Sequence, residues 1–205
     1  MQLLIATTNG HKIREIKTYL SKLPSFDIYS LLDFPKYLPP EETGESFQEN
    51  AILKAKHAAR ELKMWTLADD SGLVVPALKG APGIYSSRYA GSCATDKDNR
   101  KKLLEEMANL EGVGRSAFFE CCLALATPTA EIKKCVQGSC EGSIISKEQG
   151  GRGFGYDPLF KKYDYNQTFA ELSETIKNQV SHRAKALSKL FIYLEGLSLS
   201  NAPST

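Results

Sequence analysis

Residues 41–73 most constrain the fold, because they predict a helix followed directly by a strand, with a pair of carboxylates at each end. Ser46 and Glu49 form an S-x-x-E capping box, a sequence signature of a helix start. The apolar residues that follow recur at helical spacing and give one apolar stripe: Ala51, Ile52, Ala55, Ala58, Ala59 and Leu62. This helix is therefore expected to pack one face on a core and to return the chain to a strand.

Residues 65–68 are expected to form a short buried strand that residues 69–72 end as a turn, before a second strand at residues 73–75. The return of the chain can bring the carboxylates of residues 41–42 and 69–70 together. Carboxylates where a strand ends suit magnesium, a hard cation that prefers oxygen ligands. The alternative is a solvated loop at the first pair and an ordinary turn at the second.

The N-terminus predicts a site for an anion. An apolar strand pattern at residues 3–6 leads through a small polar loop into a helix with one apolar face. Backbone N–H groups at a helix start attract phosphate, and Lys12 in the first turn opposes the helix dipole unless an anion meets it. The P-loop pattern G-x-x-x-x-G-K-[ST] is absent. These features alone leave open whether phosphate binds.

The middle of the chain predicts a mixed sheet. Four prolines make residues 24–45 a loop-rich connection. Thr95 and Asp98 form a T-x-x-D helix start. The next strands follow in close succession, which indicates hairpins. They are expected at residues 116–126, 132–136 and 143–145.

Residues 150–158 are the glycine-richest part of the chain, and they predict a close approach of the backbone to a ligand. Phe154 offers an aromatic face on which a nucleobase can stack, and Asp157 adds a carboxylate. The alternative is a plain surface loop with Phe154 as its anchor.

A basic cluster is expected near the C-terminus. Ser181 is a suitable N-cap, so His182 and Arg183 fall in the first turn of a helix, where the dipole disfavours cations. With Lys177 they are expected to face a ligand, although a lone histidine at such a place is more often structural or solvated. Residues 196–205 are expected to form a flexible tail.

Composition limits the partners and the compartment. The net charge of +2 and the lack of a basic stripe argue against nucleic acid, and no apolar run is long enough to span a membrane. Five cysteines, an odd count without a C-x-x-C pair, indicate reduced thiols in a cytoplasmic protein, with Cys121 and Cys122 in the core. A chain of 205 residues suits one domain or two small lobes.

Together these segments resemble the inosine triphosphate pyrophosphatase family, enzymes that hydrolyse deaminated purine nucleoside triphosphates. Several separate motifs occur in family order, which makes the resemblance specific. They are residues 7–12, 42–44, 46–47, 49–51, 53–55, 68–73, 81–84, 154–158 and 181–183.

The resemblance implies an α/β fold of two lobes around an elongated mixed β-sheet, with a central active-site cleft. Residues 1–205 would be a single catalytic domain, and two chains would form a homodimer. The implied reaction converts ITP, dITP or XTP, with water and Mg²⁺, into the nucleoside monophosphate and pyrophosphate. Such a reaction keeps deaminated bases out of DNA and RNA.

The resemblance also implies residue roles. Glu42 and Asp70, together with Asp69, would bind magnesium, and Asp70 would accept a proton from the attacking water. The triphosphate would be held by Thr7, Thr8, Asn9, Gly10, His11, Lys12, Lys54 and Ser71. The nucleoside would be bound by Phe154, Gly155, Tyr156, Asp157, Lys177, His182 and Arg183. Taken without the resemblance, Lys54 is an ordinary solvated helix lysine.

Base selection has a simple chemical basis. Hypoxanthine and xanthine carry a 6-oxo acceptor where adenine carries an amino donor. A fixed donor such as Arg183 would leave adenine unpaired, and such mismatches discriminate by factors of roughly 10⁴. Phe154 would stack on any base and so would supply affinity without choice.

Two other functions compete with this one. A pyrophosphatase for modified pyrimidine nucleotides fits poorly with the segments at residues 154–157 and 181–183. A non-catalytic nucleotide-binding module fits poorly with the complete acidic set of Glu42, Asp69 and Asp70.

Overall fold

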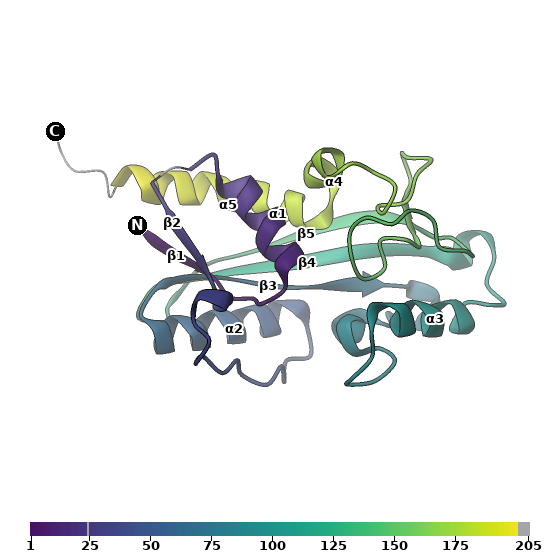
Figure 1. Cartoon of the computed structure of the whole chain (residues 1–205), viewed down its shortest axis with the longest axis horizontal. Coiled ribbons are helices and arrows are strands. Elements are labelled where there is room, and N and C mark those ends of the chain that lie inside the picture. Colours follow the sequence, from purple (N-terminus) through teal and green to yellow (C-terminus); the bar gives the residue numbers. More distant parts are fainter. Residues whose placement is uncertain (24, 201–205) are drawn as a thin grey trace. The chain divides into compact units, whose positions relative to one another are not determined.

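β3 (Trp65–Val74) is an inner strand of the sheet in this computed structural model, which describes residues 1–23 and 25–200 (Figure 1). β1 (Gln2–Ile5) pairs in parallel with β3 on one side and with β2 (Asp27–Ser30) on the other. In this register Ile5 lies opposite both Leu67 and Ser30. The register places the end of β1 beside Leu67, near the start of β3.

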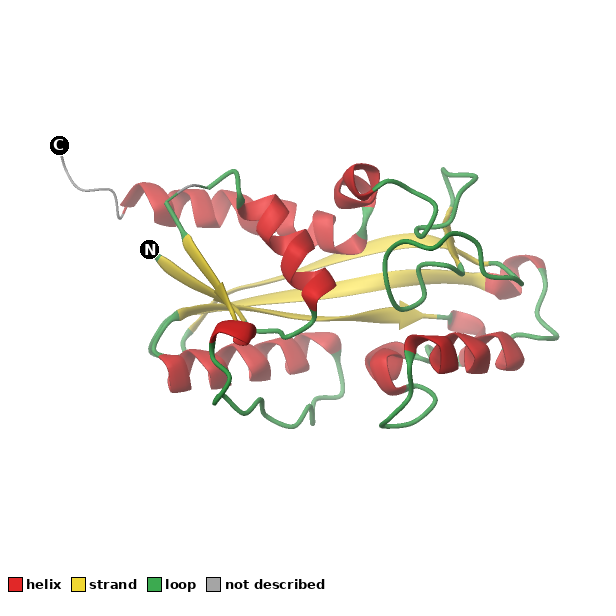
Figure 2. Cartoon of the chain, viewed as in Figure 1, coloured by secondary structure: helices red, strands yellow, loops and turns green. Residues whose placement is uncertain are grey.

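The sheet has six strands in the order β2-β1-β3-β4-β5-β6. β4 (Ser116–Ala126) lies between β3 and β5 (Ile132–Ile144). β5 pairs antiparallel with β6 (Phe160–Lys162). Parallel and antiparallel pairs occur in one sheet, with helices beside it (Figure 2), so the predicted α/β fold with a mixed sheet is confirmed.

The chain divides into two compact units. Unit 1 contains Met1–Asp70, Cys121–Gly138 and the chain from Arg183 on. Unit 2 contains Ser71–Glu120 and Ser139–His182.

Unit 1 carries α1 (Gly10–Leu20), α2 (Phe47–Leu62) and nearly all of α5 (His182–Ser200). α1 and α5 lie on one face of the strands and α2 on the other (Figure 1). The core between α1, α5 and the strands is built from buried aliphatic side chains. They include Leu3, Ile5, Ile16, Leu20, Leu123, Leu187 and Leu190.

Unit 2 carries α3 (Asp96–Glu106) and α4 (Glu174–Val180). Its core joins the buried Leu103 and Met107 to an aromatic group. The ring of Phe119 lies 4.7 Å from that of Phe160 and 5.9 Å from that of Phe169, measured between centroids. Short 3₁₀ turns complete the two units at Leu31–Asp33, Pro76–Leu78, Gly83–Arg88 and Gly112–Arg115.

The helix starts follow the predicted caps. Ser46 Oγ accepts from the backbone N–H of Glu49 at 3.1 Å, and Thr95 and Asp98 form a reciprocal capping box. The Glu49 carboxylate accepts from the N–H of Glu45 at 2.8 Å, one residue before the cap. Local side-chain chemistry therefore sets where α2 and α3 begin.

Four of the predicted secondary-structure elements and connections differ from the structure. β3 continues through residues 69–72, which were predicted to be a turn, because it is an inner strand of the sheet and its hydrogen bonding there outweighs local turn preference, although its pairing with β1 covers only residues 65–67. β5 likewise runs unbroken where two strands were predicted. β2 lies within the connection predicted to be loop-rich, and α4 is an additional helix.

The C-terminal part of the chain is more helical than predicted. α5 continues to Ser200, so residues 196–200, expected in the tail, are helical. The rest of the expected tail, residues 201–205, lies outside the described residues. Cys121 and Cys122 are buried, as predicted. No helix within the described part of the chain is both long and apolar enough to cross a membrane.

We predict that Ser46→Ala lowers the free energy of unfolding by about 1 kcal/mol, because the first turn of α2 loses its cap. Urea denaturation followed by circular dichroism measures the change. Ser188→Ala, on the exposed side of α5, is the matched control and is expected to stay within about 0.5 kcal/mol of the wild type. Equal losses in both variants would contradict the assignment of the cap.

Candidate active site

Asp69 and Asp70 are neighbours on β3, and their side chains make contacts on opposite faces of the strand. Successive residues of a strand point to opposite sides. Asp69 meets Lys12 of α1, whereas Asp70 meets Lys54 of α2. The two carboxylates therefore belong to two separate clusters within unit 1.

The Asp69 cluster consists of Lys12, Glu15, Asp69, Cys121 and Arg183. Lys12 Nζ lies 2.5 Å from Asp69 Oδ1, and Arg183 Nε lies 2.8 Å from Asp69 Oδ2. The Cys121 thiol donates to Asp69 Oδ2 at 3.2 Å. Arg183 Nη1 also lies 2.5 Å from Glu15 Oε2. The cluster joins α1, α5, β3 and β4 through charges that have little or no contact with solvent.

The charges in this cluster determine its protonation. Burial by itself would raise the pKa of Asp69, but Arg183 and Lys12 outweigh burial and hold the pKa well below its ordinary value of 3.8. Burial raises the pKa of the Cys121 thiol well above its usual range, and Asp69 adds to the effect. Asp69 is therefore a permanent anion at neutral pH, and Cys121 a neutral donor to it.

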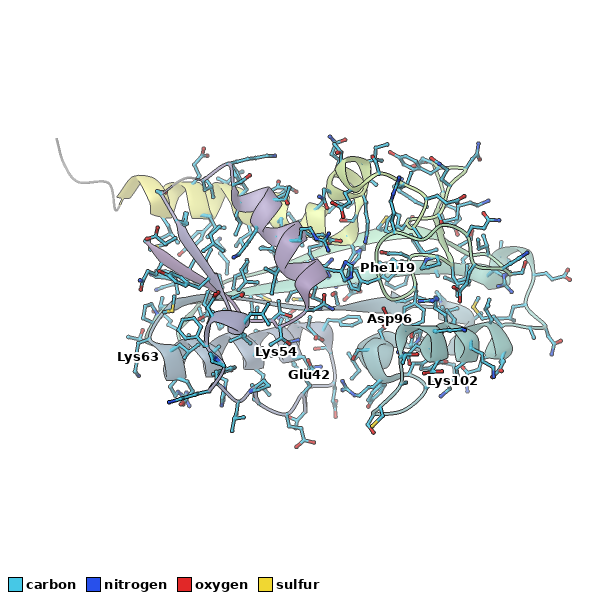
Figure 3. The ribbon with its side chains drawn as sticks, viewed as in Figure 1. Glu42, Lys54, Lys63, Asp96, Lys102 and Phe119 are labelled. Carbon is cyan, nitrogen blue, oxygen red and sulfur yellow. The ribbon has the colours of Figure 1, made fainter. Side chains whose placement is uncertain are left out.

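The Asp70 cluster consists of Glu42, Lys54 and Asp70. Lys54 Nζ lies 2.5 Å from Asp70 Oδ1 and 2.9 Å from Glu42 Oε1, so two carboxylates share one ammonium. Figure 3 labels Lys54 and Glu42. Burial raises the pKa of Asp70, and the attraction of Lys54 reduces this rise without reversing it. Burial would lower the pKa of Lys54, but Asp70 and Glu42 outweigh it and raise that pKa.

The start of α1 holds its polar loop by side-chain bonds. Asn9 Oδ1 caps the helix by accepting from the N–H groups of His11 at 3.0 Å and Lys12 at 3.2 Å. Thr7 Oγ1 accepts from the N–H of Asn9 at 3.1 Å. The sequence predicted that Lys12 meets an anion, and the anion in this structure is Asp69.

The Phe154 loop, residues 150–157 of unit 2, forms a second group of predicted site residues. Asp157 Oδ2 accepts from the N–H of Phe154 at 2.9 Å and pairs with Lys177 Nζ at 2.6 Å. Lys177 Nζ lies 4.9 Å from the centroid of the Phe154 ring. A Cβ at Gly153 would lie 2.0 Å from Asp157 Oδ2, and the φ of +75° also favours glycine. Glycine at this position therefore permits the contact between Asp157 and Phe154.

Two other predicted residues of unit 2 are buried. The Tyr156 hydroxyl donates to the carbonyl of Ser86 at 2.9 Å, which ties the loop to the 3₁₀ turn at Gly83–Arg88. The His182 ring stacks on Phe119, with centroids 4.8 Å apart and an interplanar angle of 14°. Both side chains support the unit from inside, and their predicted contact with the nucleoside stays a prediction.

The structure gathers some predicted residues and separates others. It unites Glu42, Lys54 and Asp70, and it unites Phe154, Asp157 and Lys177. Asp69 instead contacts Lys12, Cys121 and Arg183. Within residues 1–23 and 25–200, no group of three or more His, Cys, Asp or Glu side chains is arranged as a metal site.

The sequence analysis did not predict three residues that contact predicted site residues. Glu15 and Cys121 belong to the Asp69 cluster, and Phe119 stacks on His182. Glu15 shares a helix with Lys12 and lies three residues after it, which was a usable sign of a common face. Cys121 and Phe119 lie in an apolar strand, where no local pattern marks them.

Sequence comparison gives a consistent result. Residues 3–193 match the Ham1 family. A dITP/XTP pyrophosphatase of Chlamydia abortus is 60% identical over 198 residues, which cover 96% of this chain and 96% of that protein. A dITP/XTP pyrophosphatase of Chlamydia muridarum is 58% identical over 196 residues, which cover 95% of this chain and 93% of that protein.

Solved structures agree with these relatives. A HAM1 protein from Coxiella burnetii superposes with a TM-score of 0.86 and 39% identity, over 96% of this chain and 99% of that chain. The Staphylococcus aureus Ham1 protein superposes with a TM-score of 0.84 and 40% identity, over the same shares of the two chains.

We predict that Arg183→Met makes the protein more sensitive to acid. The folded-state pKa of Asp69 lies below its ordinary value of 3.8, so ionised Asp69 stabilises the fold above that pH and the stabilisation is lost as pH falls through the folded-state pKa. Removing the guanidinium raises the pKa of Asp69, so acid unfolding begins at a higher pH.

Acid titration followed by circular dichroism measures this shift. Breaking a buried ion pair also lowers stability at neutral pH by about 3–5 kcal/mol. Arg60→Met, at an exposed position of α2, is the control and leaves both values close to the wild type. An unchanged acid midpoint in Arg183→Met would show that the pair does not control Asp69.

Proposed function

This chain belongs to the Ham1 family, and on that premise we propose that it hydrolyses dITP, ITP and XTP to the nucleoside monophosphate and pyrophosphate. It is a nucleoside triphosphate hydrolase that acts on the nucleotide pool. The observation that carries the mechanism is the Asp70 cluster, in which a carboxylate with a raised pKa lies beside a lysine and a second carboxylate.

Asp70 is the proton acceptor in this mechanism. A carboxylate with a raised pKa is a stronger base than an ordinary one, which suits it to take a proton from water. The water attacks the α-phosphorus as Asp70 removes its proton, and pyrophosphate leaves as the bond between the α- and β-phosphates breaks. Lys54, charged and 2.5 Å from Asp70, keeps the base in position.

The triphosphate is held by cations of unit 1. The side chains of Lys12 and Lys54 are 15% and 14% exposed, so each ammonium is largely desolvated but still reachable. The loop from Thr7 to Lys12 adds polar groups at the start of α1. Ammonium groups in such a place stabilise the charge that develops on the phosphates.

Glu42 and Asp70 fit a magnesium ion. They already converge on one cation, the Lys54 ammonium, and their oxygens are the hard donors that Mg²⁺ prefers. When bound, the ion would neutralise charge on the phosphate oxygens. Asp69 pairs with Lys12 and Arg183 on the other face of β3. We therefore propose that Asp69 positions Lys12 and does not bind the metal ion.

The nucleoside is bound through unit 2. Phe154 stacks on the purine, with Lys177 and Asp157 holding the Phe154 loop beside it. Because a stacked aromatic accepts every base, a fixed donor to the 6-oxo group is needed to reject adenine. Guanine shares the 6-oxo group, so its rejection depends on contacts near its 2-amino group. Tyr156 and His182 of unit 2, and Arg183 of unit 1, remain predicted contributors to nucleoside binding.

Two further proposals rest on the family. The chain forms a homodimer, which sedimentation velocity tests directly. It works in the cytoplasm, consistent with five cysteines that form no disulfide in the described part of the chain.

The central prediction concerns products. Incubation with equal concentrations of ITP, GTP or ATP and Mg²⁺ is expected to release pyrophosphate from ITP and little from the other two. Separate assays for pyrophosphate and orthophosphate identify the bond that is broken. Orthophosphate as the first product would contradict attack of water on the α-phosphorus. Tight ITP binding without turnover would favour a regulatory nucleotide-binding module.

We predict that Asp70→Asn lowers kcat for ITP by about 10²–10⁴-fold with the fold intact, because the proton acceptor is lost. Steady-state pyrophosphate release and circular dichroism measure the two effects. Asp164→Asn, at a carboxylate whose side chain is 81% exposed, is the matched control with unchanged kcat. Turnover of Asp70→Asn near that of the wild type would remove Asp70 from the mechanism.

We predict that Phe154→Ala raises KM about tenfold for all purine triphosphates, because the loss of stacking costs roughly 1–3 kcal/mol per base. The rise is expected to be similar for ITP and GTP, and kcat is expected to change little. Tyr163→Ala, an aromatic of unit 2 that is 57% exposed, serves as the control. A change confined to kcat would contradict the stacking role.

A further inference from the structure

Gly155 lies between Phe154 and Tyr156, and side chains of α3 bind its backbone on both sides. Its N–H donates to Asp96 Oδ2 at 2.7 Å. Its carbonyl accepts from Arg100 Nη1 at 2.8 Å. Asp96 and Arg100 are four residues apart on α3, so they project from the same face of the helix.

These two bonds hold the peptide groups on either side of Gly155. A Cβ built on Gly155 would meet nothing within 4 Å, so no side-chain packing at this residue adds to them. Its φ of +59° lies in the left-handed region, which glycine adopts easily. The neighbouring backbone is held as well, because the N–H of Asp157 donates to the carbonyl of Phe154 at 3.1 Å.

The bonds to α3 also fix Phe154. The N–H of Gly155 belongs to the peptide group that follows Phe154, and the N–H of Phe154 donates to Asp157 Oδ2 at 2.9 Å. Asp157 therefore holds the backbone before the aromatic residue and Asp96 holds it after. The direction of the Phe154 ring depends on both contacts.

α3 is a firm support for this contact. Its first turn is fixed by the Thr95–Asp98 capping box, and a carboxylate at Asp96, the first helical residue, is favoured by the helix dipole. Asn99 is buried and anchors the helix by donating to the carbonyl of Ser87 at 3.1 Å. Figure 3 labels Asp96 at the start of this helix.

Arg100 is also held in place on its other side. Its Nε lies 2.9 Å from Glu148 Oε1, and its side chain is 14% exposed. This is an ion pair without hydrogen-bond geometry, because the buried Nε makes no hydrogen bond among the described residues. Glu148 therefore balances the charge of Arg100, and the hydrogen bond from Nη1 to the carbonyl of Gly155 directs the guanidinium.

We propose that Asp96 and Arg100 are positioning residues that lock the Gly155 backbone and so hold Phe154 ready to stack on the purine base. The proposal rests on the proposed function of the Phe154 loop. A loop that is ordered before binding pays less conformational entropy on binding, so the lock acts on substrate affinity. Stacking is alike in the ground state and the transition state, so its loss raises KM and leaves kcat nearly unchanged.

The test compares Asp96→Ala and Arg100→Met with their conservative counterparts, Asp96→Asn and Arg100→Lys, which keep an acceptor and a donor. Each disruptive variant is expected to raise KM for ITP about fivefold, since a hydrogen bond to a charged group is lost. kcat stays within about twofold, and the conservative variants recover most of the affinity. Inhibition by inorganic tripolyphosphate, which carries no base, is expected to be unchanged.

Asp98→Ala is the matched control, because it weakens the start of α3 without touching Gly155. Hydrogen–deuterium exchange of peptides covering residues 150–158, in the free protein, is the second readout. Exchange there is expected to rise in Asp96→Ala and Arg100→Met and to stay as in the wild type in Asp98→Ala. This measurement needs no turnover, so it tests the lock even if the wild type does not hydrolyse ITP.

The outcomes separate the two proposals. Unchanged exchange at residues 150–158 in both disruptive variants overturns the lock, whatever the activity. A rise in KM in Asp98→Ala equal to that in Asp96→Ala also overturns it, because helix stability would then be the cause. Faster exchange with a normal KM shows that the lock does not serve base binding and overturns the proposal. A wild type that releases no pyrophosphate from ITP refutes the proposed function alone.

Discussion

The buried carboxylate of Asp69 is the contact on which unit 1 depends. A charge without contact to water is costly unless it is paired and hydrogen-bonded, and Asp69 receives two cations and a thiol. These partners come from α1, α5 and β4, so one side chain joins three elements to β3. Removing either cation would leave the cluster with an excess buried negative charge, which explains why this cluster is a structural requirement as well as part of the proposed site.

The adjacent Asp70 shows how one strand can support two kinds of carboxylate. Both residues are buried, yet the pKa of Asp69 is lowered and that of Asp70 is raised. The difference follows from their partners, because Asp69 meets two cations while Asp70 shares its one lysine with Glu42. Alternation along β3 gives the two aspartates different partners, which agrees with our proposal that Asp69 is structural and Asp70 transfers a proton. Membership of the Ham1 family and the chemistry of this cluster lead to the same class of reaction.

The Phe154 loop achieves its order differently. Here glycines permit a path that other residues could not follow, and polar side chains then hold that path. Gly153 allows Asp157 to bind the N–H of Phe154, and Asp96 and Arg100 bind the backbone at Gly155. The glycines allow the backbone of the loop to adopt this path, and contacts with distant residues then hold it there.

Local patterns in the sequence determined the caps at Ser46 and Thr95 and the apolar faces of α1 and α2, because these depend on neighbours within one or two helical turns. The family motifs in the sequence also supplied the predicted site residues, and their roles stay predictions. The sequence wrongly predicted a turn at residues 69–72, since the hydrogen bonding of β3 within the sheet outweighs local preference. Only the tertiary structure placed Asp69 and Asp70 in separate clusters and brought Asp96 to Gly155. Those contacts join residues far apart in the chain. They form, and contribute to stability, only after the elements have packed together.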